Sequence, residues 1–550
     1  MLAAAAASGP RLRRVLVVSA PGLERCLERE LQVLGVPGRL EAAPGGVMVH
    51  GTGESLWRAV MESRVAESAR VLVGDPFHAP TKAALDAGLR RLPWEDFLPI
   101  APARAAQAEA AAGARQEPVE ADIVVSSDRS RLYHERMVRE RALDAVEHRR
   151  RALLAEAAAA AAAAPAARGA GAAALGPASD AGSGGAAASA GGAAASAGGP
   201  ARDLGFEGAA AGASGARAQP RRQAAATTVR LRLRHDECQV SVDGSGPLHM
   251  RGYRKAGGEA PLRESLAAAC VMTSPLLRRL TAALHGGEEL VLWDPFCGSG
   301  TLVLEALAAV LGQPPGDRGR RYPFTRFPCH GEEEEAYGGL LSSTWRPHPA
   351  AGSLTLQGTD RSQEQIDRAT RNLHRFRRRL WRSDDPGVGA GCGDVGTEVP
   401  ARIADGGADS DFPCRVHFRQ GSLTKVASEL AGRPTITMIL TNVPYGAWSG
   451  ARDSRRSAGQ SEAAEAHGQL GRLLWQQRAD WRGVFCLVAS AEDFRRHTGL
   501  EWTSELRFLS GARWLWRGPA DLLQWTGRRS PGAGGAAPRG AGGGGRRAGR

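Results

Sequence analysis

The chain has 550 residues, too many for a single hydrophobic core, so its length predicts several domains. Glycine occurs 70 times and aromatic residues make up only 5%, which excludes a chain that is ordered throughout. Lys and Arg together number 71 against 58 for Asp and Glu, and a net charge of +13 suits a polyanionic partner such as nucleic acid. Nearly all of the cations are arginines in an Ala- and Gly-rich chain, a composition that a GC-rich genome produces for any function, so the charge alone is weak support.

The cysteines exclude the commonest zinc motifs. Eight are scattered along the chain, and no two lie within four residues of each other. We therefore expect no metal and no disulfide framework, but reduced thiols in an intracellular, soluble monomer, in the cytoplasm or in an organelle. The acid-free start MLAAAAASGPRLRR leaves the compartment open, and no apolar run is long enough to predict a membrane span.

The first predicted unit covers residues 11–66. RVLVVSA (14–20) has the pattern of a buried strand, and PGLERCLERELQVLG that of an amphipathic helix. Strand–turn–strand signals and a second helix, ESLWRAVMESR, follow. This order predicts a small ferredoxin-like unit.

A second α+β unit is predicted over residues 67–250. It contains strands from Val71 and over 121–127, a basic helix from Ser130, and an alternating hairpin, TTVRLRLRH and CQVSVDG, with a tight HDE turn. Residues 157–226 between them are mostly Ala, Gly and Ser. We expect them to form a disordered insertion.

The remainder, 251–526, predicts a doubly wound α/β domain. Residues 290–294 (LVLWD), 353–360, 414–421, 435–442 and 483–490 have strand patterns, with helical stretches between most of them. Polar, glycine-rich insertions are expected around 311–350 and 383–411. The arginine- and glycine-rich tail, 527–550, has no core residue and is expected to be disordered.

A cofactor loop is predicted where DPFCGSGT follows the first of these strands. Gly298 and Gly300 allow positive φ and close approach of a ligand, and Ser299 and Thr301 are expected to cap the next helix. Asp294 would repel a pyrophosphate but attract an ammonium group, which favours S-adenosylmethionine over a dinucleotide. The candidate cofactor residues of this loop are Asp294, Phe296, Gly298, Ser299, Gly300 and Thr301. A plain strand–turn–helix junction is the alternative.

Asp360 ends the second strand, where open-sheet enzymes place the acid that accepts ribose hydroxyls. The same residue with Gln363 has the spacing of a helix capping box, which is the competing interpretation.

TNVPYG (441–446) indicates the reaction type. The Asn442 side-chain oxygen and the Val443 carbonyl can accept both hydrogens of a planar exocyclic amine and so orient its lone pair towards a methyl donor. Pro444 shapes the turn, and Tyr445 offers a ring on which a base can stack. A strand ending in an ordinary Pro-Tyr-Gly turn is the alternative.

Together these segments resemble the RlmL-type 23S rRNA guanine-N2 methyltransferases. DPFCGSGT and TNVPYG are similar to motifs I and IV of amino-methyltransferases, MRGYRKAGGEAPLRESLAAA (250–269) to the segment before the catalytic domain, and SRLYHERMVRER (130–141) to a stretch of the THUMP domain. The resemblance implies a Rossmann-like methyltransferase domain preceded by ferredoxin-like and THUMP domains. It also implies S-adenosylmethionine as donor, RNA as substrate and a guanine 2-amino group as acceptor.

Three departures from the family pattern matter. Val443 replaces the first proline of NPPY and reduces its rigidity. Ser422 stands where an acid usually contacts adenine, and no second methyltransferase domain follows Trp525, so only the guanine-N2 activity is implied.

RNA contacts are expected from the THUMP region and the linker. Arg230, Arg232 and Arg234 alternate along one strand, about 7 Å apart, near the spacing of phosphates, although a solvated face has the same pattern. The candidate RNA-binding residues are Arg131, Arg230, Arg232, Arg251, Tyr253, Arg254 and Lys255. A THUMP-class tRNA guanine-N2 methyltransferase, a non-catalytic RNA-binding ribosome-assembly factor, and an N6-adenine DNA or glutamine methyltransferase remain as alternatives.

Overall fold

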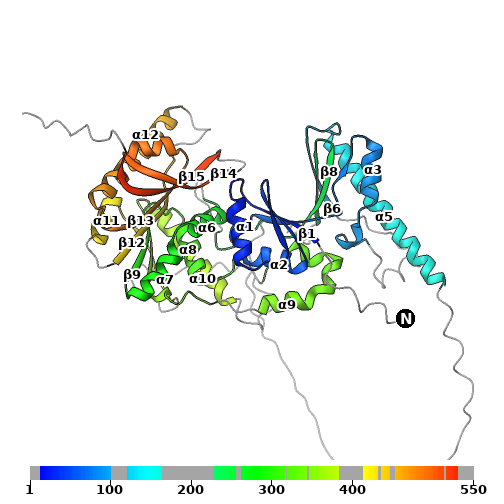
Figure 1. The fold of residues 1–550 in the computed structure, drawn as a ribbon, viewed down its shortest axis with the longest axis horizontal. Coiled ribbons are helices and arrows are strands. Elements are labelled where there is room, and N and C mark those ends of the chain that lie inside the picture. Colours follow the sequence, from blue (N-terminus) through cyan, green and yellow to red (C-terminus); the bar gives the residue numbers. More distant parts are fainter. Residues whose placement is uncertain are drawn as a thin grey trace, which may run out of the picture. The chain divides into compact units, whose positions relative to one another are not determined.

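The computed structural model describes residues 13–100, 121–163, 227–254, 262–316, 319–342, 346–382, 413–431, 435–445, 453–512 and 516–530. Two β-sheets organise these residues, and both belong to one compact unit of the chain. The first sheet is built from residues before 250 and the second from residues after 288, and we call the two parts the N-terminal region and the catalytic region (Figure 1).

The N-terminal region begins with the predicted ferredoxin-like unit. Its elements are β1 (Arg13–Val18), α1 (Glu24–Val33), β2 (Arg39–Ala43), β3 (Gly46–Gly51), α2 (Gly53–Glu62) and β4 (Ser68–Leu72). Alternate residues such as Val15, Val17, Val47 and Val49 are buried, because a strand with one covered face places every second side chain in the core. The last strand, β4, lies beyond the boundary that we expected at residue 66.

The same sheet continues into the second predicted unit. β4 pairs antiparallel with β8, which gives the order β2-β3-β1-β4-β8-β7-β6, with β5 paired to β8. The added elements are β5 (Phe77–His78), α3 (Lys82–Arg90), the 3-10 turn η1 (Trp94–Asp96), β6 (Ala121–Asp128), α5 (Glu135–Ala163), β7 (Thr227–Arg234) and β8 (Glu237–Asp243).

The predicted hairpin between β7 and β8 is confirmed. His235 and Asp236 form its turn with φ of 51° and 61°, the left-handed conformation that a two-residue hairpin turn requires. The expected insertion from residue 157 begins inside a helix, since α5 ends at Ala163, and residues 164–226 lie outside the described part of the chain.

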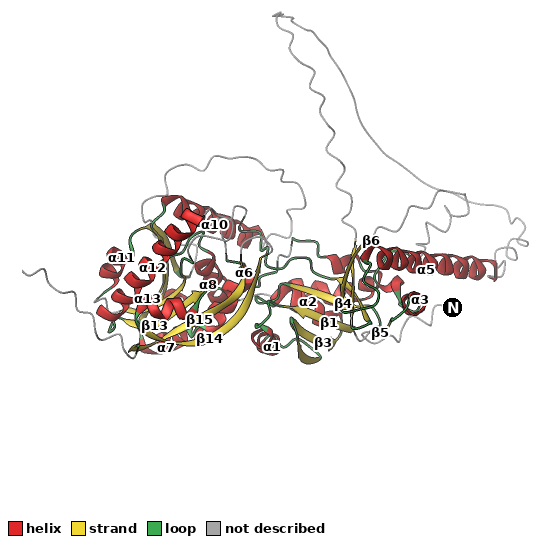
Figure 2. Cartoon of the chain, turned by 90° about the horizontal axis from the view of Figure 1, so that it is seen from above, coloured by secondary structure: helices red, strands yellow, loops and turns green. Residues whose placement is uncertain are grey.

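The catalytic region has the predicted doubly wound sheet, in the order β11-β10-β9-β12-β13-β15-β14. Five parallel strands are followed by a long antiparallel pair, β14 and β15, visible in Figure 2. The strands are β9 (Glu289–Asp294), β10 (Leu354–Asp360), β11 (Arg415–Gln420), β12 (Thr435–Asn442), β13 (Trp481–Val488), β14 (Leu500–Ala512) and β15 (Trp516–Arg529).

Helices cover this sheet in two groups. α11, α12 and α13 share a core cluster with strand residues such as Trp293 and Ile439, and α8 contacts both α6 and α10. Right-handed crossovers on either side of β9 place the two groups on opposite faces. The helices are α6 (Glu264–Thr273), α7 (Leu276–Gly286), α8 (Thr301–Val310), α9 (Glu334–Ser342), α10 (Gln363–Arg382), α11 (Leu423–Leu430), α12 (Asp453–Gln476) and α13 (Ala491–Thr498), with 3-10 turns η2 (Pro323–Arg326), η3 (Pro328–Glu333) and η4 (Ala351–Ser353).

The expected insertion at 311–350 packs its aromatic side chains against the N-terminal region. Its residues Phe324 and Tyr337 are buried, and the Tyr337 ring lies 5.5 Å from that of Trp57 in α2. Phe327 packs edge-on against Phe97, with ring centroids 5.5 Å apart. We read the segment as polar from its overall composition, but its aromatic side chains cover the N-terminal region.

Two further expectations concern the end of the chain and the second insertion. The tail was expected to lose order from Gly527, whereas β15 continues to Arg529 and Ser530 donates a hydrogen bond to the Gly499 carbonyl. Residues 383–411 and 531–550 lie outside the described residues.

Candidate active site

The candidate site lies at the carboxyl ends of three neighbouring strands. β9 pairs in parallel with β10 on one side and with β12 on the other. Asp294, Asp360 and Asn442 are the last residues of these three strands. Because parallel strands end at the same edge of a sheet, the predicted donor loop and the predicted acceptor segment are brought together.

The glycine loop between β9 and α8 has the predicted backbone. Gly298 and Gly300 have φ of 51° and 81°. A Cβ at Gly300 would lie 2.7 Å from the Phe418 ring, whereas a Cβ at Gly298 would meet no described atom within 4 Å. Gly298 therefore leaves open space on the side where a ligand can approach the loop.

The hydrogen bonds that fix the glycine loop differ from the helix caps that we expected. Gly300 is the N-cap of α8, and no side chain makes a capping hydrogen bond, so the predicted caps from Ser299 and Thr301 are wrong. Both residues are buried. The Ser299 carbonyl accepts a hydrogen bond of 3.0 Å from Asn372 of α10, which ties the loop to the next helix.

Asp360 supports the loop rather than a capping box. Its carboxylate accepts hydrogen bonds from the backbone N–H groups of Gly298 (3.1 Å) and Ser362 (2.9 Å). The Gln363 side chain donates instead to Asp367 at 2.8 Å, so the capping-box alternative is not formed.

Asp294 connects the two halves of the site. It is 3% exposed, and its Oδ1 accepts hydrogen bonds from the Thr441 hydroxyl (2.5 Å) and the Phe296 N–H (3.2 Å). Burial raises the pKa of Asp294 to about 7, the Asp360 charge adds to that rise, and the two hydrogen bonds oppose it. This carboxyl therefore changes charge near neutral pH.

The acceptor segment contains a buried acceptor atom with no partner. Asn442 Oδ1 is buried and makes no hydrogen bond to any residue that the structure describes. A buried oxygen without a partner is costly, and an N–H donor from a bound molecule would satisfy it. Tyr445 is half-buried, burial raises the pKa of its hydroxyl, and the residues that follow it, from 446 to 452, lie outside the described residues.

Val443 replaces proline rigidity with a hydrogen bond. Its N–H donates to the Leu487 carbonyl of β13 at 3.2 Å, a bond that proline cannot make, and its side chain is buried in the core. The Pro444 carbonyl accepts a hydrogen bond of 2.9 Å from His467 Nε2, so the turn is fixed on both sides of the Val-Pro bond. Ser422 is exposed and caps α11 by accepting from the Lys425 N–H at 3.4 Å.

Three residues of the site were missed from the sequence. Thr441 is the first residue of the TNVPYG segment, but the sequence assigned it no role, because the need for a hydroxyl there depends on its distant partner Asp294. His467 and Asn372 come from helices 25 and 12 residues beyond Asn442 and Asp360, and no spacing rule links them to either motif.

The linker residues predicted to bind RNA have another role. Arg251 and Tyr253 are 5% and 1% exposed, and both donate hydrogen bonds to the buried carboxylate of Glu305 in α8. Arg254 pairs with Glu264 at 2.9 Å. The side chains of Arg251 and Tyr253 are thus packed between the regions and not presented to RNA, and Lys255 lies outside the described residues.

The candidate RNA-binding residues of the N-terminal region are more accessible. Arg232 and Arg234 are exposed on one face of β7, Arg230 on the same face is half-buried, and the side chain of Arg131 is 76% exposed. Tyr133, which we did not single out, is 66% exposed, and its ring lies 4.1 Å from that of His134.

Over the described ranges, none of the helices is both long and apolar enough to cross a membrane. The same residues contain no group of three His, Cys, Asp or Glu side chains arranged to hold a metal ion.

Two family models match the chain. Residues 251–379 match the RMKL-like methyltransferase domain, and residues 14–72 match the RlmL ferredoxin-like domain. These matches confirm the resemblance drawn from the motifs and place β4 within the ferredoxin-like domain.

Curated relatives include two ribosomal RNA large subunit methyltransferases K/L. The protein of Marinomonas sp. is 36% identical over 148 residues, 27% of this chain and 20% of the relative. That of Marinobacter nauticus is 30% identical over 301 residues, 54% of this chain and 33% of the relative. The chain thus spans about a fifth to a third of the length of these relatives.

Solved structures confirm the Rossmann-like methyltransferase fold of the catalytic region. A protein assigned by prediction as a methyltransferase and complexed with SAH superposes with a TM-score of 0.57 at 17% identity, covering 95% of this chain and all of that one. A Listeria monocytogenes protein assigned by prediction as an N6-adenine-specific DNA methylase gives a TM-score of 0.53 at 19% identity, covering 94% and 96% of the two chains.

Proposed function

Because residues 251–379 match the RMKL-like methyltransferase domain, we propose that the chain is an S-adenosylmethionine-dependent RNA methyltransferase that modifies the 2-amino group of a guanine in large-subunit rRNA. The observation that carries the proposal is the acceptor atom Asn442 Oδ1, buried without a partner. It lies one residue from Thr441, whose hydroxyl donates to Asp294 of the glycine loop.

The residues of the loop suit the proposed donor. Gly298 leaves room beside the backbone, and the carboxylates of Asp294 and Asp360 would attract an ammonium group and accept ribose hydroxyls, respectively. Phe296, half-buried beside the loop, adds an apolar surface. When bound, S-adenosylmethionine supplies a methyl group on a positively charged sulfur.

The acceptor residues would orient the amine. Asn442 Oδ1 and the Val443 carbonyl would each accept one N–H hydrogen, which directs the nitrogen lone pair away from both oxygens. Tyr445 would stack on the base. No general base is required before attack, because the proton leaves easily once the nitrogen has been methylated.

The substrate class rests on the relatives and on the N-terminal region. The two curated relatives described above are named for large-subunit rRNA. Residues 67–250 are proposed to form a THUMP-type domain with Arg131, Arg230 and Arg232 at the RNA surface. The hydrogen bond from the Val443 N–H to Leu487 fixes this part of the backbone without a proline, which favours an enzyme over a non-catalytic assembly factor.

The test is methyl transfer to RNA from cells that lack the gene. Purified protein is incubated with S-adenosylmethionine and either rRNA or tRNA, and nuclease digests are analysed for N2-methylguanosine by mass spectrometry. We expect the product in large-subunit rRNA. Product only in tRNA would support the tRNA enzyme, and methylated adenine would refute the guanine assignment.

Asn442→Ala is the matched variant. It should abolish turnover and leave cofactor affinity, measured by calorimetry, nearly unchanged, because the amide would contact only the acceptor. A variant with normal turnover would contradict the mechanism.

A further inference from the structure

Helix α10 carries an unusual concentration of positive charge. Its 20 residues contain seven arginines and two acids. Ile366, Ala369 and Phe376 are buried on its inner side. At 100° per residue, Arg371, Arg375 and Arg378 fall within a sector of about 60° on the outer side.

The arrangement of these arginines is unfavourable for the helix itself. Arg371 and Arg375 are four residues apart, as are Arg375 and Arg379, and like charges at this spacing destabilise a helix. Arg371 and Arg378 are exposed, and Arg378 has no acidic residue three or four positions away. Near the start of α10, Arg368 pairs with Glu364 and Asp367 lies four residues before Arg371, so the unbalanced positive charge is confined to the second half of the helix. A face that only needs solvation does not require repeated like charges.

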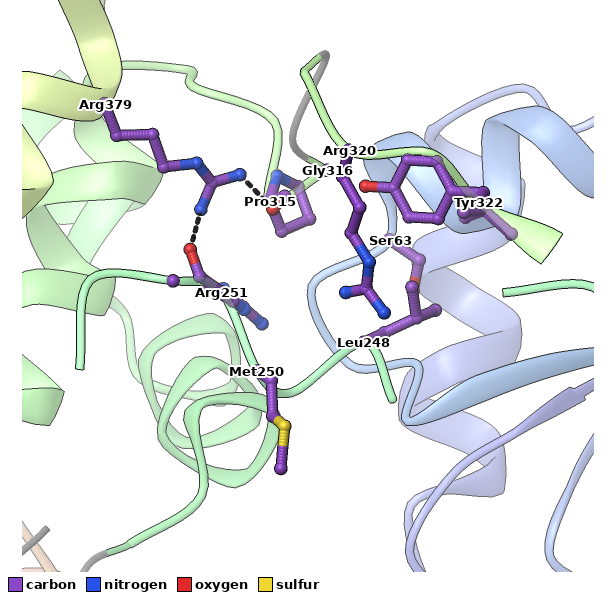
Figure 3. Close-up of a pocket in the computed structure, with 11 residues that line it drawn as sticks. Ser63, Leu248, Met250, Arg251, Pro315, Gly316, Arg320, Tyr322 and Arg379 are labelled. Carbon is purple, nitrogen blue, oxygen red and sulfur yellow. Dashed lines mark hydrogen bonds between the residues drawn. The ribbon is translucent and has the colours of Figure 1, made fainter. Parts of the chain in front are cut away.

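The C-terminal end of α10 meets the contact between the two regions. Arg379 donates to the backbone carbonyls of Arg251 and, at 2.7 Å, of Pro315 (Figure 3). The adjacent Gly316 N–H donates to the Met61 carbonyl of α2 at 2.9 Å. The C-terminal end of the basic helix therefore lies beside the N-terminal region.

The middle of α10 reaches the candidate active site. Arg375 donates to Asn372 Oδ1 at 3.2 Å, and Asn372 in turn donates to the Ser299 carbonyl of the glycine loop at 3.0 Å. The arginine row thus extends from the regional contact towards the loop that precedes α8.

A cavity of about 260 Å³ opens beside the C-terminal end of this row. Its lining includes three arginines, Arg251, Arg320 and Arg379, and no acidic residue. Arg251 is already paired with Glu305 and Arg379 with backbone carbonyls, so Arg320 is the lining residue that would contact a phosphate. The Arg320 guanidinium lies 5.1 Å from the centre of the Tyr322 ring, and in Figure 3 it extends between Arg251 and Ser63.

We propose that the RNA backbone crosses from the N-terminal region to the active site along a basic path formed by this cavity and by Arg371, Arg375 and Arg378 of α10. The proposal rests on the proposed function and extends it, because it names the surface that positions the RNA. The rise along the helix separates successive arginines of the row by about 4.5–6 Å, within reach of neighbouring phosphates of one strand. Arginine forms two parallel hydrogen bonds with a phosphate, and such contacts fix position without reading sequence.

The test is the salt dependence of RNA binding. Arg371→Gln/Arg378→Gln, and separately Arg320→Gln, are compared with the wild-type chain by fluorescence anisotropy on a fluorescein-labelled RNA hairpin. A hairpin of arbitrary sequence serves, since phosphate contacts are independent of sequence. The double variant loses two phosphate contacts, so the slope of log K for RNA binding against log salt concentration should become shallower by about 1.4–1.8, and binding should weaken about tenfold or more. Arg320→Gln loses one contact and should reduce the slope by about half as much.

The matched control is Arg472→Gln/Arg482→Gln, which removes two exposed arginines of the catalytic region outside the path. The control should keep the wild-type slope, and all variants should keep the wild-type melting temperature and affinity for S-adenosylmethionine. An unchanged slope in either path variant, or an equal loss in the control, would overturn the proposal. Failure of the wild-type chain to methylate RNA would instead refute the proposed function.

Discussion

Replacing Glu305 by alanine should destabilise the catalytic region strongly. The side chains of Glu305 and Arg251 are 0% and 3% exposed, so their ion pair is fully removed from water. Removing one partner of such a pair leaves an uncompensated charge and costs about 3–5 kcal/mol, and Tyr253 would also lose the acceptor of its hydroxyl, worth about 1–3 kcal/mol. Because the two losses share one carboxylate, we expect a total of about 4 kcal/mol.

Thermal unfolding followed by calorimetry measures this loss. At about 2–4 °C per kcal/mol for a region of this size, the melting temperature should fall by roughly 10 °C. The control is the triple variant Arg251→Met/Tyr253→Phe/Glu305→Met, since apolar replacement of a whole buried cluster is often neutral or stabilising. A shift of less than about 2 °C in Glu305→Ala, or a triple variant as unstable as the single one, would refute the reasoning.

Three further predictions concern the site. Burial raises the pKa of Asp294 from 3.8 to about 7, so between these pH values the folded protein holds more protons than the unfolded chain. The free energy of unfolding should therefore fall as the pH rises from about 4 to about 7, by about 4 kcal/mol in all. Urea unfolding across this range should show the fall, and Asp294→Asn should remove it; an identical pH profile in the variant would exclude this carboxyl as the cause. Thr441→Val removes a hydrogen bond that lowers the Asp294 pKa, so any pH dependence of methyl transfer from this carboxyl should move to higher pH, whereas Thr441→Ser should retain the wild-type profile. Val443→Pro restores the common family motif but deletes the hydrogen bond to Leu487, and turnover should fall several-fold; an increase would show that proline rigidity matters more than the bond.

The parallel sheet and the location of the site could be predicted because their signals are local. LVLWD is a buried strand, and the acids and the amide that end β9, β10 and β12 come directly after such runs. A doubly wound sheet brings the carboxyl ends of its parallel strands to one edge. Asp294 and Asn442 could therefore be placed at one sheet edge from the sequence alone.

The supporting contacts could not be predicted, because each joins residues far apart in the chain. Arg251 looked like a surface cation until Glu305, 54 residues later, proved to be its buried partner. His467 reaches the Pro444 carbonyl from a helix whose sequence carries no mark of that contact. The four aromatic residues among the sixteen positions 322–337 were overlooked because the wider segment, 311–350, is rich in glycine and charged residues.

That aromatic segment has a consequence for how the gene can be divided. Phe327 and Tyr337 belong by sequence to the catalytic half, yet they cover Phe97 and Trp57 of the other half. A fragment ending near residue 250 would leave the rings of Phe97 and Trp57 exposed to water. The complementary fragment would carry Phe327 and Tyr337 without the residues that they cover. The two halves are therefore poor candidates for separate expression or for exchange between homologues. A chimaera would have to take Phe97, Trp57, Phe327 and Tyr337 from the same parent.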